Sequence, residues 1–245
     1  MAVSSRTDIA MTTTATPWPH AVVTGVSSGI GRAIAQRLLA EGWRVTGLCR
    51  SMPADTHEHL RIVQADVADI EHLPQVCAQI TEDGTPVQAF IHAAGFMRTA
   101  PLGELDTDKG LAMWRLHVQA AEVMANALLP RMPDGARIVL IGSRTANGSP
   151  TRSQYAATKA ALIGMVRSWA LELGPRGITA NVIAPGATDT PFLRDPARAQ
   201  TLPKMPLIGR LVQPEEVAAL AAFLLGPHGG AMTGQNLVMC GGASL

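Results

Sequence analysis

Short apolar runs alternate with amphipathic stretches along most of the chain. The runs are typical of buried strands, and they cover residues 21–23, 43–49, 61–65, 89–91, 138–141, 178–183 and 237–239. Between them, apolar residues three and four apart predict helices around residues 34–39, 70–80, 111–129 and 155–173, with a last helix from Pro214. This alternation predicts an α/β fold: a single doubly wound domain over residues 20–245, with about seven parallel strands and helices on both faces of the sheet.

Two segments lack this periodicity. Residues 1–19 are rich in Ser, Thr and Ala, so we expect a disordered N-terminal tail, in which Met1 and Met11 are both possible starts. Residues 190–210 contain four prolines, Pro191, Pro196, Pro203 and Pro206. Long irregular segments in compact domains are usually functional, so we interpret residues 190–210 as a lid over a substrate, with a passive connection as the alternative.

Composition excludes several classes of function. Hydrophobic residues make up 47% of the chain and charged residues 16%, and the net charge is +1, so nothing attracts nucleic acid or an anionic membrane. The three cysteines, Cys49, Cys77 and Cys240, are widely separated, which argues against a disulfide framework and a zinc site. The longest apolar run of the second half, residues 217–225, is too short to span a bilayer. We therefore expect a cytoplasmic protein with a small-molecule substrate and no metal.

A glycine motif follows the first strand. Residues 24–31 read Thr-Gly-Val-Ser-Ser-Gly-Ile-Gly and lead directly into a helix. Gly25 allows a tight turn, Gly29 lets the backbone approach a pyrophosphate, and Gly31 lets the helix pack close to the strand. A turn without a ligand is the alternative, but three glycines in this context favour a dinucleotide, with its phosphates at the helix N-terminus.

The end of the second strand bears on the choice of cofactor. An acidic residue at this point would hold the ribose 2′-hydroxyl of NAD, but the chain has Cys49, Arg50 and Ser51. A cation and a hydroxyl suit a 2′-phosphate, so Arg50 and Ser51 predict a preference for NADP(H) over NAD(H). The alternative is an exposed arginine in a loop.

Residues 138–159 carry the candidate chemistry. Tyr155 and Lys159 are four apart on a predicted helix and so share a face. A nearby ammonium lowers the pKa of a phenol toward the pH at which proton transfer is efficient. Ser143, at the end of the strand before, can donate a hydrogen bond to the same substrate oxygen. A tyrosine and a lysine one turn apart are common on solvated helices, so the pair alone does not decide.

Taken together, these motifs resemble those of the short-chain dehydrogenase/reductase superfamily over about residues 21–245. The resemblance implies a Rossmann fold in which Tyr155 exchanges the proton, Ser143 positions the substrate oxygen, and Lys159 holds the nicotinamide ribose. Thr233-Gly234-Gln235 and Gly241-Gly242 also match the family pattern. The cofactor residues implied are Thr24, Gly25, Ser27, Ser28, Gly29, Ile30, Gly31, Asp66, Val67, Ala93, Ala94, Gly95, Tyr155, Lys159, Pro185, Gly186, Thr188 and Thr190.

The resemblance also implies an activity and an assembly. The expected function is NADP(H)-dependent hydride transfer between nicotinamide and a small ketone or secondary alcohol, as in 3-oxoacyl reductases. Residues 187–190 also look somewhat like those of NAD-dependent dihydrodiol dehydrogenases, and a non-catalytic dinucleotide-binding regulatory protein is a further alternative. A homo-oligomer, tetramer or dimer, would pack through the two long helices, where Ala156, Ala157, Ala160, Ala161 and Gly164 permit close approach. The alternative is that these small residues pack on the sheet of their own chain.

Three residues depart from the family pattern. His117 stands where the family usually has an asparagine that supports a proton relay, His92 replaces the first asparagine of the strand-four motif, and Cys240 stands where an acidic residue often precedes the terminal glycines. Because an imidazole both donates and accepts protons, His117 is either the relay itself or a histidine satisfied in the interior.

Overall fold

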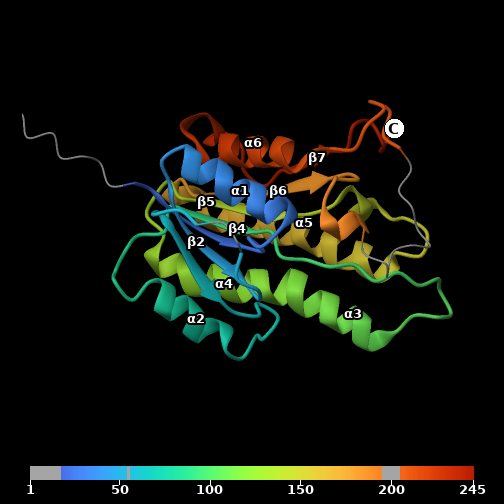
Figure 1. The fold of residues 1–245 in the computed structure, drawn as a ribbon, viewed down its shortest axis with the longest axis horizontal. Coiled ribbons are helices and arrows are strands. Elements are labelled where there is room, and N and C mark those ends of the chain that lie inside the picture. The colour runs from blue at the N-terminus through green and yellow to red at the C-terminus, as the bar shows by residue number, and fades with distance from the viewer. Residues whose placement is uncertain (1–17, 54–55, 195–204) are drawn as a thin grey trace, which may run out of the picture.

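The computed structural model describes residues 18–53, 56–194 and 205–245. These residues form a seven-stranded sheet with the order β3-β2-β1-β4-β5-β6-β7, in which every neighbouring pair is parallel (Figure 1). The α/β, doubly wound fold expected from the sequence is confirmed. The strands are β1 (His20–Thr24), β2 (Arg44–Cys49), β3 (Leu60–Gln64), β4 (Ala89–His92), β5 (Arg137–Ile141), β6 (Thr179–Pro185) and β7 (Asn236–Met239).

Helices cover both faces of the sheet, as Figure 1 shows. One face carries α1 (Gly29–Ala40) and α6 (Pro214–Leu225), and the other carries α2 (Leu73–Ile80), α4 (Ala120–Leu128) and α5 (Ser153–Leu173). Consecutive strand residues enter opposite cores: in β1, Val22 packs in the core with α2 and α4, and Val23 in the core with α1 and α6. Because both faces are buried, the strands are apolar throughout rather than alternating with polar residues.

The helix expected over residues 111–129 is not one regular α-helix. It begins earlier, as α3 (Thr107–Trp114), because the Asp106 side chain accepts a hydrogen bond from the Lys109 N–H at 3.0 Å. A π-helical turn, Arg115–Gln119, then separates α3 from α4, and the Ala120 N–H donates to the Arg115 carbonyl five residues earlier. The apolar pattern continues through this turn, so periodicity does not reveal it.

The last helix starts where the sequence predicts. Pro214 occupies the first turn of α6, and the side chains of Gln213 and Glu216 form a reciprocal capping box with the backbone. The helix buries Val217 and Ala221 against α1, and so closes the second core.

Much of the expected tail and part of the expected lid lie outside the described residues. Residues 1–17, which include Met11, and residues 195–204 are not described. Of the rest of the lid, Thr190 is buried, Pro191–Arg194 forms a 3₁₀ turn, and the Ile208 N–H donates to the Gly241 carbonyl at 3.2 Å. The described parts therefore pack on the carboxyl edge of the sheet.

Within the described residues, no helix has both the length and the apolar character that crossing a membrane requires.

Candidate functional site

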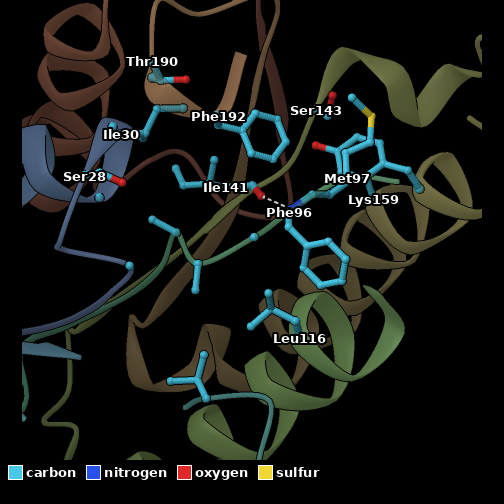
Figure 2. A pocket seen from close by; sticks show the side chains of 18 of the residues that line it. Ser28, Ile30, Phe96, Met97, Leu116, Ile141, Ser143, Lys159, Thr190 and Phe192 are labelled. Atoms are coloured by element: carbon cyan, nitrogen blue, oxygen red, sulfur yellow. Dashed lines mark hydrogen bonds between the residues drawn. The ribbon is translucent and has the colours of Figure 1, made fainter. Parts of the chain in front are cut away.

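A cavity of about 860 Å³ lies at the carboxyl ends of β1 to β6. Most of the residues expected from the sequence line it: Gly25, Ser27, Ser28, Gly29, Ile30, Gly31, Arg50, Ser51, Asp66, Val67, Ala93, Ala94, Gly95, Ser143, Tyr155, Lys159, Pro185, Gly186, Thr188 and Thr190. Figure 2 shows Ser28 and Ile30 on one side of the cavity, opposite Ser143 and Lys159. Two expected residues, Thr24 and His117, lie behind this lining.

The glycine turn leaves room for a ligand in front of α1. Gly25 has a φ of +77°, and a Cβ there would lie 2.9 Å from the Ala94 nitrogen. A Cβ on Gly31 would collide with the Gly25 carbonyl, so the helix packs directly on the turn. Ser28 precedes α1, and its side chain caps none of the first N–H groups of the helix. This arrangement fits a phosphate.

Polar groups gather at the other end of the same half of the cavity. Arg50 and Ser51 follow β2 and are exposed, and Gln64 Nε2 fixes the backbone there by donating to the Arg50 carbonyl at 2.9 Å. Asp66 follows β3, and its Oδ1 accepts from the Ala68 N–H at 3.0 Å. Together with the glycine turn, these residues fit a dinucleotide.

The helix α5 brings Lys159 and Tyr155 to the opposite end. Lys159 is 4% exposed, and its Nζ donates to the Ile141 carbonyl at 2.8 Å (Figure 2). The same Nζ lies 5.8 Å from the centre of the Tyr155 ring. Burial lowers the pKa of Lys159 to about 7. The positive charge beside the phenol therefore depends on pH near neutrality.

Ser143 lies at the end of β5 on the same side. It begins the 3₁₀ turn Arg144–Asn147, and its Oγ accepts from the Thr145 N–H at 3.1 Å. This bond occupies a lone pair of the hydroxyl and leaves its proton for donation to an oxygen in the cavity.

Thr24 and His92 join β1, β4 and the π-helical turn. Thr24 Oγ1 accepts from the N–H groups of Ala93 and Ala94, both at 3.0 Å, so its own proton goes to His92 Nδ1 at 3.0 Å. His92 Nε2 then donates to the Leu116 carbonyl at 2.9 Å. Thr24 thus supports the loop that lines the cavity rather than lining it.

His117 joins the π-helical turn to two other segments. The Thr158 hydroxyl donates to the Tyr155 carbonyl at 2.8 Å, so it accepts from His117 Nδ1 at 2.9 Å. His117 Nε2 in turn accepts from the Phe96 N–H at 3.2 Å, and the His117 ring meets the Tyr155 ring edge-on. Both ring nitrogens are therefore used in one fixed tautomer of a neutral imidazole.

Both histidines are fully buried, and both stay neutral. Burial, followed by the charge of Lys159, lowers the pKa of His92 to about 3. The same two causes, with a contribution from His92, lower the pKa of His117 well below its ordinary value.

Other residues of the cavity carry little signal in the sequence. Phe96, Met97, Arg98, Arg144, Arg152 and Phe192 line its second half, which is where a substrate would lie. Arg144 follows Ser143, and Arg152 lies three residues before Tyr155, so their positions next to expected site residues were the one available clue.

The described residues contain no group of three or more His, Cys, Asp and Glu side chains that could hold a metal ion. All three cysteines are free and buried.

Comparisons with known proteins identify the family. The family model described as enoyl-(acyl carrier protein) reductase matches residues 25–244. The chain therefore belongs to the short-chain dehydrogenase/reductase superfamily, and it is an NAD(P)-dependent oxidoreductase of that superfamily.

Individual relatives agree with this assignment. The chain is 33% identical to the 3-oxoacyl-[acyl-carrier-protein] reductase FabG of Vibrio harveyi, over 91% of this chain and 96% of that protein. Among solved structures, it matches a blue fluorescent protein from a metagenomic library in complex with NADPH, with a TM-score of 0.83, 34% identity, and coverage of 93% and 98% of the two chains. A short-chain dehydrogenase from Burkholderia cenocepacia J2315 in complex with NADP gives the same values.

The fixed neutral state of His117 can be tested by replacement. His117→Asn keeps an acceptor for Phe96 and a donor for Thr158, whereas His117→Ala leaves the Phe96 N–H buried without its partner and opens a cavity. We expect His117→Ala to lower the free energy of unfolding by about 2–4 kcal/mol and His117→Asn to recover most of that loss, as measured by urea denaturation.

The matched control for the stability measurement is His57→Ala, because His57 is exposed.

The pH profile of kcat distinguishes a histidine that only supports the structure from one that relays protons. Because His117 is neutral in the folded protein, we expect the profile of His117→Asn between pH 5 and 8 to match the wild type. A profile that loses an ionisation in this range would show that His117 relays protons.

The buried ammonium of Lys159 makes stability depend on pH. Its pKa is about 7 in the folded protein and about 10.4 when unfolded, so the unfolded chain binds more protons between these values and stability rises with pH. From pH 7 to 9 we expect the cofactor-free wild type to gain about 2 kcal/mol of unfolding free energy relative to Lys159→Met.

Urea denaturation at both pH values measures this difference. The matched control is Lys109→Met, because Lys109 is exposed and should leave the pH dependence unchanged. An equal pH dependence in the wild type and in Lys159→Met would mean that Lys159 keeps an ordinary pKa.

Proposed function

We propose that this enzyme interconverts small ketones and secondary alcohols with NADP(H), and that Tyr155 is the general acid and base. The observation that carries the proposal is the continuity of one cavity from Arg50 and the glycine turn to Ser143, Tyr155 and Lys159. A cofactor bound along the first half would end beside the phenol. When bound, nicotinamide supplies or accepts the hydride.

The residues of the chain would bind the cofactor, position the substrate and transfer the proton. The N–H groups at the start of α1 bind the phosphates, and Lys159, tied to the Ile141 carbonyl, meets the ribose. Ser143 donates its free proton to the carbonyl oxygen of the substrate and holds it against Tyr155. Tyr155 donates its proton to that oxygen during reduction and recovers it from solvent afterwards. A charged Lys159 favours the phenolate that remains.

A preference for NADP(H) rests on Arg50 and Ser51 and on the buried, uncharged Cys49. No carboxylate stands at the end of β2, where one would repel a 2′-phosphate and hold a 2′-hydroxyl. Two of the matching structures contain NADPH or NADP, in agreement with this choice. The relatives named as 3-oxoacyl-[acyl-carrier-protein] reductases support a carbonyl as the substrate.

Three further properties belong to the same proposal. The described residues 190–194 belong to a lid over the substrate, since Thr190 and Phe192 line the cavity. The protein is a homo-oligomer that packs through α5, because Ala157, Ala160 and Gly164 form an exposed face of small residues. Its compartment is the cytoplasm, where the free cysteines stay reduced.

The choice of cofactor is tested by calorimetric titration with NADPH and with NADH. Because a hydrogen bond to a charged group contributes about 1.5–3 kcal/mol, we expect Arg50→Ala to weaken NADPH binding by about 10-fold or more. NADH binding should change by less than about twofold, since Arg50 has no phosphate to bind there. Arg61→Ala, which removes an exposed arginine on β3, is the control. Equal binding of the two cofactors by the wild type would instead favour an NAD-dependent dihydrodiol-type dehydrogenase.

The acid–base role is tested by Tyr155→Phe, which removes the proton and keeps the ring. We expect kcat for ketone reduction to fall by about 10²- to 10⁴-fold, while the Kd of NADPH stays within about twofold. Full activity in this variant would refute the assignment, and NADPH binding without turnover in the wild type would favour a non-catalytic binding protein.

Tyr155 is the sole tyrosine of the chain, so the near-ultraviolet absorbance of phenolate reports on it directly. Because the pKa of Lys159 is about 7, its charge can lower the pKa of Tyr155 only if the phenol titrates at or below that pH, and in that case Lys159→Met should move the midpoint to higher pH. A midpoint that does not change, or one that lies near the pH at which a free phenol titrates, would separate Lys159 from the ionisation of Tyr155.

A further inference from the structure

Two arginines stand beside Tyr155 at the substrate end of the cavity. Arg144 follows Ser143 directly, and Arg152 is the residue before the first turn of α5. Both are half-buried, and both line the cavity that Tyr155 lines. Both arginines therefore belong to the wall that also contains the catalytic phenol.

The charges of these groups act on one another. Burial lowers the pKa of Arg152, the positive charge of Arg144 lowers it further, and Tyr155 raises it. Arg144 and Tyr155 are thus within electrostatic reach of Arg152. Two like charges in a partly buried hollow repel each other, and an anion bound between them removes that repulsion.

The charges of the lining are unevenly distributed between its two ends. Among the described residues, two carboxylates line the cavity: Asp66 at the end of β3, and Asp108, which is exposed in the first turn of α3. At the substrate end, Arg98 adds to Arg144 and Arg152. Asp108 is the one carboxylate of the described lining near these arginines, because the Asp106 carbonyl two residues earlier accepts from Gln154 Nε2 on α5 at 2.9 Å. The Arg98 guanidinium lies 5.1 Å from the centre of the Phe96 ring, and Nη1 donates to the Met97 carbonyl at 3.0 Å. The potential at the substrate end is therefore positive.

The remaining lining at this end is apolar. Figure 2 shows Met97 and Phe192 on either side of Ser143, with Phe96 farther away toward Leu116, and all three line the cavity. A ligand that fits these walls has a carbon skeleton for the aromatic rings and a negative group for the guanidiniums.

We propose that the substrate is a carbonyl compound that carries a carboxylate or a phosphate, and that Arg144 and Arg152 bind this anionic group while the carbonyl faces Ser143 and Tyr155. Guanidinium matches both anions, because its planar fork donates two parallel hydrogen bonds. The inference rests on the proposed carbonyl reduction and adds the class of substrate. A different role for the arginines would be to favour the Tyr155 phenolate, which would affect neutral and charged substrates alike.

Paired substrates test the inference with the NADPH-loaded enzyme. Each pair differs only in charge: 3-, 4- and 5-oxo carboxylic acids against their methyl esters, and dihydroxyacetone phosphate against dihydroxyacetone. We expect the anionic member of at least one pair to have a kcat/KM about 10-fold or more above that of its partner, since a charge-assisted hydrogen bond contributes about 1.5–3 kcal/mol. The preferred pair identifies the anion and its distance from the carbonyl.

Variants then assign the preference to the arginines. Arg144→Gln and Arg152→Gln should each lower the ratio of kcat/KM for the anionic member to kcat/KM for the neutral member by about 10-fold or more. Arg152→Lys, which keeps the charge without the fork, should recover part of the loss. The control is Arg131→Gln, because Arg131 is exposed after α4 at the opposite edge of the sheet.

The possible outcomes separate the inference from the proposed function. Equal kcat/KM within every pair, or a preference that survives in both glutamine variants, would overturn the anion site. An equal fall of kcat for charged and neutral members would also overturn it in favour of a role in Tyr155 ionisation. If the wild type reduces no ketone, the proposed function fails, and calorimetric binding of the same acids to the NADPH complex decides the inference: arginine-dependent binding supports it, and its absence overturns it.

Discussion

The parallel arrangement of the strands is the constraint on which the whole cavity depends. In a parallel sheet the carboxyl ends of all strands lie at the same edge. Gly25, Asp66, Ser143 and Gly186 follow four different strands and still line one space. The crossover helices return on both faces of the sheet, so the edge itself stays open to a ligand. The same helices bring Tyr155 and Lys159 on α5 to that edge.

An open edge has a cost, because the polar backbone groups just beyond the strands still need partners. Thr24 provides acceptors for Ala93 and Ala94, and His117 provides one for Phe96. His92 completes the network through the Leu116 carbonyl. Neutral imidazoles suit this place, since each presents a donor and an acceptor without adding a charge next to the buried Lys159. A network of hydrogen bonds thus lies behind the lining of the cavity.

The sequence predicted the parts of the molecule that depend on local pattern. Apolar runs located all seven strands, and the spacing of Tyr155 and Lys159 placed them on one side of α5. The π-helical turn Arg115–Gln119 was not predicted, because the apolar spacing runs through it unchanged. The bond between His92 and Leu116 joins residues 24 positions apart, and it exists only after β4 and the turn have packed together. Tertiary contacts of this kind leave no periodic signal in the chain.

The two halves of the cavity differ in whether backbone or side chains line them. This difference explains how far the fold determines function. The cofactor half consists of backbone and glycine at the strand ends, where a Cβ on Gly25 or Gly31 would strike neighbouring backbone, so the fold itself fixes its shape. The substrate half consists of side chains, among them Phe96, Arg144 and Arg152, on turns and at the start of α5. Single replacements there change charge and volume without disturbing the sheet. Membership of the family therefore determines the cofactor chemistry, while the side chains of the second half are free to vary with the substrate.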